Sequence, residues 1–117
     1  MSDDDLRTRT KKFALRIIRL FGRLPKTSES QIIGKQLLRS GTSVAANYRE
    51  SCRARSTAEM IAKLGIVEQE LDESILWMEL LSDAEIVRSE LLRDVLDEAE
   101  QLLKMTVSSI KTLKTRR

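Results

Sequence analysis

Hydrophobic residues recur every three or four positions along most of the chain, which places them on one face of an α-helix. The pattern predicts four helices, at about residues 4–23, 28–53, 56–83 and 89–113. Residues 89–113, for example, turn inward the positions Leu92, Val95, Ala99, Leu102, Thr106, Ile110 and Leu113. For residues 56–83 the pattern predicts a seam of Ile61, Leu64, Glu68, Leu71, Ile75 and Met78.

Helix ends are marked by local signals. Pro25, the single proline, ends the first helix, because the residue before a proline is forced out of helical geometry. Ser28–Gln31 and Ser56–Glu59 match the capping-box pattern and open the second and third helices. Four long helices with short connections predict an all-α fold. It is an antiparallel, up-down-up-down four-helix bundle that forms one domain over residues 1–117.

The stretch RSGTSVAANYRES, residues 39–51, is rich in residues that usually break a helix. The hydrophobic period nevertheless continues through it by way of Gly41, Val44 and Tyr48. We therefore interpret it as helix. Gly41 is expected where a neighbouring helix crosses closely.

Polar residues of this stretch are expected to meet carboxylates of the third helix. One interpretation is a structural network that fixes the register of the helices, and the other is a ligand or catalytic pocket. The residues of this predicted polar seam are Arg39, Ser43, Asn47 and Glu50 with Glu70 and Asp72.

Charge is distributed unevenly around a net value of +3. Residues 6–26 hold eight bases and no acid, whereas residues 68–100 hold twelve acids and two bases. Part of the basic set follows helical spacing and is expected on a face opposite Phe13, Ile17 and Leu20. This stripe predicts binding of nucleic acid through phosphates. Alternatively, it is a solvated face, or it pairs with residues 68–100 of its own or a neighbouring subunit. The stripe consists of Arg9, Lys12, Arg16, Arg19, Arg23 and Lys26.

Composition disfavours catalysis and metal binding. The chain has no histidine and one cysteine, Cys52, so the commonest general base and the usual zinc ligand sets are missing. We expect no enzyme activity, no metal and no cofactor. No apolar run reaches the ~18 residues of a membrane helix, and the acidic start, Asp3–Asp5, is unlike a signal peptide. A cytoplasmic protein without a membrane partner is expected.

Residues 75–81 are apolar at six of seven positions, more than one inward stripe requires. Exposure of the additional apolar residues would create a large hydrophobic surface patch, so the chain is expected to form a homo-oligomer. The predicted interface consists of Leu76, Trp77, Leu80 and Leu81.

Residues 39–81, together with DAEIVRSELL (83–92) and VSSIKTLK (107–114), resemble the four-helix-bundle proteins encoded in intervening sequences of bacterial 23S rRNA genes. Leu71 departs from the family pattern, which more often has alanine there. The resemblance implies the bundle fold, a ring-shaped homopentamer and no catalytic residues. Nucleic-acid binding is the usual proposal for the family, and a related branch serves as accessory factor to the reverse transcriptase of diversity-generating retroelements. The matching positions are Arg39, Ser40, Ser43, Asn47, Tyr48, Glu50, Arg53, Arg55, Ser56, Glu70, Asp72, Glu73 and Trp77.

These observations predict a non-enzymatic bundle that binds RNA or DNA without sequence specificity. The alternative is a protein-interaction adaptor, or accessory subunit, that does not touch nucleic acid itself.

Overall fold

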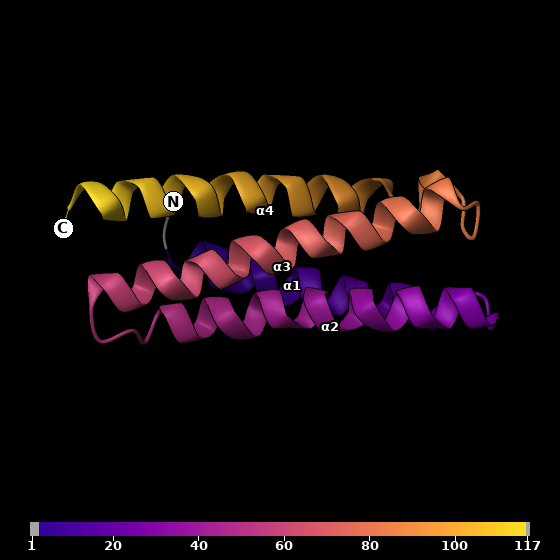
Figure 1. Ribbon diagram of the computed structural model, residues 1–117, viewed down its shortest axis with the longest axis horizontal. Coiled ribbons are helices and arrows are strands. Elements are labelled where there is room, and N and C mark those ends of the chain that lie inside the picture. The colour runs from indigo at the N-terminus through magenta and orange to yellow at the C-terminus, as the bar shows by residue number, and fades with distance from the viewer. Residues whose placement is uncertain (1–2, 117) are drawn as a thin grey trace.

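The computed structural model describes residues 3–116, with side chains from residue 5 onward. The described residues form four helices and no strand: α1 (Asp3–Gly22), α2 (Ser28–Ser51), α3 (Thr57–Asp83) and α4 (Ser89–Thr115). They run alternately up and down in a bundle of 48 × 20 × 20 Å (Figure 1). The predicted all-α four-helix bundle is confirmed, and each helix begins and ends within two residues of its predicted bounds. Residues 1, 2 and 117 of the predicted domain lie outside the described residues.

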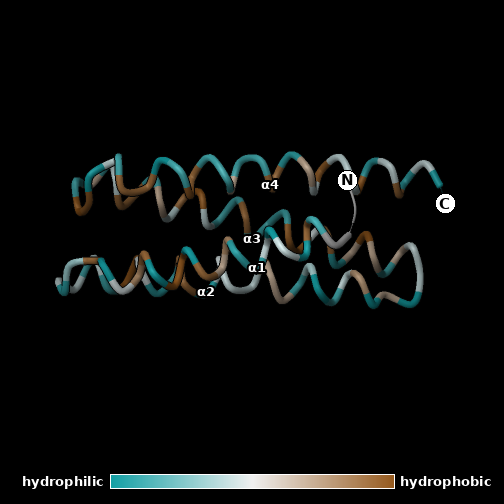
Figure 2. The backbone as a smooth tube through the Cα atoms, turned by 180° about the vertical axis from the view of Figure 1, so that it is seen from behind, coloured by the Kyte–Doolittle hydropathy of each residue, from teal (hydrophilic) through white to brown (hydrophobic). Residues whose placement is uncertain are grey.

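Helices that follow one another in sequence pack side by side, and α1 and α4 close the ring. The α1–α4 seam is the loosest of the four. Hydrophobic stretches recur along α4 on the side that faces the other helices (Figure 2). The core runs the full length of the bundle. Its largest fully buried side chains are Phe13, Ile17, Leu37, Val44, Leu64, Val67, Leu71, Met78, Leu81, Leu92, Leu102 and Thr106.

The inward face of α3 differs from the predicted seam. Val67, Ser74 and Leu81 are buried there, whereas Glu68 and Ile75 are only half-buried at its edge. The buried face is still one stripe, with positions three and four residues apart, and it shares Leu64, Leu71 and Met78 with the predicted seam. It takes Val67 and Ser74 in place of Glu68 and Ile75, because α2 and α4 cover that side of α3.

Caps fix where α2 and α3 begin. The Ser56 side chain accepts a hydrogen bond from the Glu59 amide at 3.0 Å, as the sequence predicts. At α2 the N-cap is Thr27 and not Ser28, because the Thr27 hydroxyl accepts from the Ser30 amide at 3.4 Å. Ser28 is thereby the first helical residue.

The stretch 39–51 is helical, as predicted, and α2 continues through it to Ser51. Gly41 lies at a close crossing with α1. A Cβ atom at this position would be 2.8 Å from Cγ1 of Ile17, well inside contact distance. Small residues in α2 therefore let α1 and α2 approach each other.

The end of α3 turns the chain sharply toward α4. Glu85 has a φ of 57°, and the amide of Ile86 donates to the Leu81 carbonyl at 3.0 Å. This is the hydrogen-bonding pattern of a Schellman motif, in which a glycine usually occupies the left-handed position. Ile86 packs against the core that contains Leu81.

Candidate nucleic-acid interface

The predicted basic stripe is split by the fold. Arg9, Lys12, Arg16 and Arg19 lie on α1, but the helix ends at Gly22. Arg23 and Lys26 therefore belong to the connection that leads into α2.

Arg9 is engaged inside the protein. Its Nε donates to Oε2 of Glu98 at 3.0 Å and its Nη2 donates to Oε1 at 2.6 Å. The guanidinium therefore binds the carboxylate in a bidentate manner. Nη2 also reaches Oε1 of Gln101 at 3.1 Å. The hydrogen bond to Glu98 raises the pKa of the Arg9 guanidinium above its ordinary value. Arg9 thus ties α1 to α4 across the loosest seam, and it is no longer a free cation of the stripe.

Three further arginines of the stripe face the same seam. Arg16, Arg19 and Arg23 line a hollow of about 200 Å³ together with Leu20 of α1 and Asp94 of α4. The prediction that the stripe lies opposite Leu20 is therefore wrong, because both border one hollow. Four members of the stripe, Arg9, Arg16, Arg19 and Arg23, thus flank the core on the side of α4. Pairing with the protein's own acidic stretch, one of the alternatives above, is realised for Arg9 through Glu98.

A second group of cations gathers between α1 and α2. Arg7, Lys11 and Lys12 of α1 and Arg49 of α2 line a groove of about 430 Å³, which we term the α1–α2 groove. All four side chains are exposed, and the described residues that line the groove include no acid. The stripe did not include Arg7 and Lys11, because they lie on α1 outside its helical spacing. Arg49 was missed because a repeat within one helix cannot reveal a residue that a neighbouring helix contributes.

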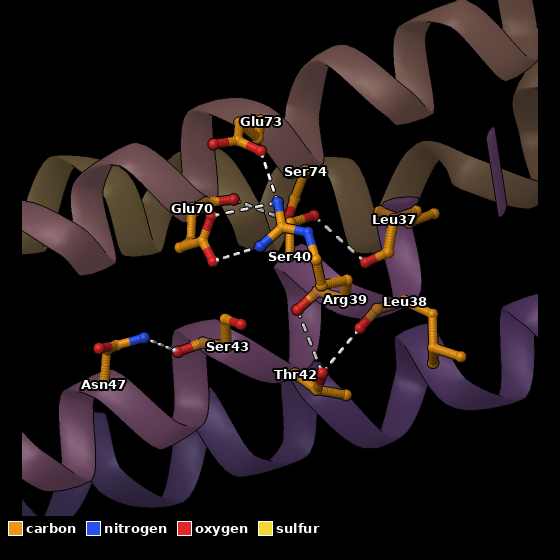
Figure 3. A network of polar contacts seen from close by, with 10 residues as sticks. All are labelled: Leu37, Leu38, Arg39, Ser40, Thr42, Ser43, Asn47, Glu70, Glu73 and Ser74. Carbon is orange, nitrogen blue, oxygen red and sulfur yellow. Dashed lines mark hydrogen bonds and ion pairs between the residues drawn. The ribbon is translucent and has the colours of Figure 1, made fainter. Parts of the chain in front are cut away.

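The predicted polar seam is only partly assembled. Arg39 of α2 donates to Oε2 of Glu70 at 2.9 Å and to Oε1 of Glu73 at 2.6 Å, both on α3 (Figure 3). The hydrogen bond to Glu70 raises the pKa of the Arg39 guanidinium. Glu70 is nearly buried whereas Arg39 is half-exposed, so this cluster borders solvent.

The remaining seam residues are separate. The Asn47 amide donates to the Ser43 carbonyl at 2.9 Å, within α2 (Figure 3). Glu50 accepts from Lys63 of α3 at 2.9 Å, and Asp72 is exposed. The six residues therefore do not converge on one pocket.

The most buried polar contact between α2 and α3 is a pair of serines outside the predicted seam. The hydroxyls of Ser40 and Ser74 lie 2.8 Å apart, and Ser74 also donates to the Glu70 carbonyl at 2.8 Å (Figure 3). Both serines are fully buried. Ser74 is not part of the predicted seam of α3, so the predicted seam gave no signal for this pair.

The predicted oligomer interface divides into exposed and buried parts. Leu76 and Leu80 are 46% and 37% exposed. Leu81, in contrast, is fully buried within the subunit, so its assignment to the interface is wrong. Trp77 is half-buried against the core, and its Nε1 has no acceptor among the described residues. Leu81 lies on the same buried face of α3 as Val67 and Ser74, and Ile86 packs against the core beside it.

Two other kinds of site do not occur within residues 3–116. None of the helices combines the length and apolar character needed to cross a membrane. Nor do the described Cys, Asp and Glu side chains form any group of three or more that could hold a metal ion.

Comparison with known proteins agrees with the fold. Residues 3–108 match the model of the 23S rRNA-intervening sequence protein family. Among solved structures, a protein of unknown function from the S23 ribosomal protein family of Bacteroides thetaiotaomicron is 35% identical. The match covers 95% of this chain and 99% of that chain, with a TM-score of 0.88. Among curated proteins, none matches the chain. The family match over most of the sequence and the shared fold lead to one conclusion: the chain belongs to the 23S rRNA-intervening sequence protein family.

Proposed function

We propose that this protein is a non-enzymatic homo-oligomer that binds RNA or other nucleic acid. It contacts the phosphates and does not recognise a base sequence. The observation that carries the proposal is the α1–α2 groove, in which four exposed cations from two helices face the same space. Each cation that neutralises a phosphate releases a counterion, which favours binding at low salt.

The groove is better suited to phosphates than the stripe predicted from sequence. Arg9 is held by Glu98, and Arg16, Arg19 and Arg23 share their hollow with Asp94. An anion entering that hollow would meet a carboxylate as well as the arginines. In the α1–α2 groove, Lys11, Lys12 and Arg49 have no such competitor among the described lining residues.

Direct reading of bases is not part of the proposal. Base stacking needs exposed aromatic rings. Tyr48 is buried, Trp77 is half-buried and neither lines the groove. The polar contacts available there are charges and one hydroxyl, that of Thr8, which recognise a backbone and not a sequence.

Charge reversal tests the groove. Lys11→Glu with Arg49→Glu should weaken binding of a fluorescent single-stranded RNA by about tenfold or more at ~50 mM salt, and should flatten the dependence on salt. Fluorescence anisotropy over a salt series measures both. Lys111→Glu with Lys114→Glu is the matched control, because it changes the net charge equally at exposed positions of α4.

The outcomes separate the two candidate functions. Equal losses in the two double variants would remove the groove from the site. If the wild type binds neither RNA nor DNA at ~50 mM salt, where phosphate contacts are strongest, the adaptor function replaces nucleic-acid binding.

Exposed apolar residues on α3 support the oligomer. Ile66, Leu76 and Leu80 are all more than one-third exposed on this helix, and burial against another copy would remove them from water. Assembly would also repeat the α1–α2 groove and increase affinity for a long polyanion through multivalency. The family resemblance implies five subunits.

Light scattering tests the assembly. The wild type should have a multiple of the 13.4 kDa chain mass, and Leu76→Glu with Leu80→Glu should shift it toward the monomer. Ile32→Glu is the control, because Ile32 is 65% exposed but lies on α2. A monomeric wild type at micromolar concentration would refute the oligomer.

A further inference from the structure

One end of the bundle is open. The last turns of α4 and the first turns of α3 extend beyond the described start of α1 (Figure 1). A hollow of about 600 Å³ lies at this end, bordered by all four helices; we term it the end hollow. Sites for small molecules usually measure ~300–1,000 Å³, so its volume is sufficient for one.

The interior of the end hollow is apolar. Leu6 of α1, Tyr48 of α2 and Leu64 of α3 are buried side chains that line it. Met60 of α3 and Met105 of α4 are half-buried and line it as well. Methionine side chains are flexible and polarizable, so they can adapt to an apolar ligand of variable conformation.

The α4 side of the end hollow is polar and positively charged. Lys104 and Arg116 are exposed lining residues, and Ser108 and Thr112 add hydroxyl groups between them. The described lining residues include no acid. Neither cation forms an ion pair with another described residue, so both are available to an anion.

We propose that the end hollow binds a single-chain amphiphile with an anionic head group, namely a free long-chain carboxylate. The alkyl chain would cover the apolar surface formed by Leu6, Leu64 and Met105, which removes that surface from water. The carboxylate would lie near Lys104 and Arg116, where charge complementarity selects its sign. This site is separate from the α1–α2 groove and shares no residue with it.

The ligand series tests chain and charge independently. Calorimetric titration of the full chain with dodecanoate, below its micelle concentration, should give saturable binding. Dodecyltrimethylammonium has the same chain with a cationic head, and acetate has the same head without the chain. Both should bind about tenfold more weakly or worse, because each satisfies only one half of the site. Equal binding of the cationic amphiphile, or no heat with dodecanoate, would overturn the proposal.

Two variants and a control locate the site. Lys104→Glu with Arg116→Glu should weaken dodecanoate binding about tenfold, whereas the control pair Lys111→Glu with Lys114→Glu should change it less than about twofold. The four positions are exposed on α4 or at its end, but only the first pair lines the end hollow. Ser109→Phe places a ring in the hollow and should abolish binding, with circular dichroism showing whether helicity is kept. Equal effects of both charge pairs would assign dodecanoate to general electrostatic attraction and refute the site.

Discussion

Replacing Gly41 with alanine adds one methyl group at the close crossing of α1 and α2. The new Cβ would lie 2.8 Å from Cγ1 and 3.0 Å from Cγ2 of Ile17, whose side chain is fully buried. Carbon atoms prefer separations of about 3.5–4.0 Å, so Ile17 or the whole helix must move by several tenths of an ångström. Overpacking of this kind costs about 1–3 kcal/mol.

Helix propensity acts in the opposite direction. Alanine is about 1 kcal/mol more favourable than glycine inside a helix, so the net destabilisation by Gly41→Ala should be about 0–2 kcal/mol. Gly65→Ala is the matched control, because Gly65 lies inside α3 and an added Cβ would have no atom within 4 Å. That variant should be stabilised by up to about 1 kcal/mol. The two variants should therefore differ by about 1–3 kcal/mol in free energy of unfolding.

Urea unfolding followed by circular dichroism measures this difference, and a double-mutant cycle locates its cause. Ile17→Ala removes Cγ1 and Cγ2, the two nearest of the three Ile17 carbons that the new methyl group meets. The loss caused by Gly41→Ala should therefore shrink in the Ile17→Ala background. If Gly41→Ala and Gly65→Ala were equally stabilising, the close approach of α1 and α2 at Gly41 would be disproved.

Four further substitutions test an ion pair, a pair of hydroxyls and a turn. Glu98→Gln should lower stability by about 1 kcal/mol, as the half-buried pair with Arg9 is weakened, while the exposed Glu100→Gln should change it by less than about 0.5 kcal/mol; thermal melts compare the two, and equal shifts would mean that the pair contributes nothing. Ser40→Ala and Ser74→Ala should each cost about 1 kcal/mol, and the double variant less than their sum, because the two hydroxyls bond each other; additive losses in urea unfolding would deny that bond. Glu85→Gly should raise stability by about 0.5–1 kcal/mol, since glycine adopts a φ of 57° without a steric cost; a lower urea midpoint would show that the Glu85 side chain itself stabilises the turn.

Features encoded within one helix could be predicted from the sequence. The helix bounds follow from hydrophobic period, proline and caps, all of which act over a few residues. Gly41 could be placed at a crossing because a glycine on an apolar helical face leaves room for the backbone of a neighbouring helix. In each case the residues that give the signal lie within about one helical turn of the position that is predicted.

Contacts between helices were harder to anticipate. Arg9 and Glu98 are 89 positions apart, and nothing in either neighbourhood selects the other. Leu81 was assigned to a surface because it was surplus to the predicted seam of α3, whereas the buried stripe of this helix takes Val67, Ser74 and Leu81. Arg49 joins Lys11 only because α2 lies beside α1.

The error about the basic stripe has a simpler origin in helical geometry. One residue advances an α-helix by about 100°, because a turn takes 3.6 residues. Ile17 follows Arg16, and Leu20 follows Arg19, so each core residue lies about 100° from its basic neighbour and not 180°. A stripe at that angle flanks the core. The spacing within α1 does not tell which neighbouring helix the arginines will face. In this bundle the neighbour is α4, which places Asp94 and Glu98 beside them. The cations available to an outside anion are consequently those turned away from α4, which include Lys12 of the stripe, and this is why the α1–α2 groove carries the proposed function.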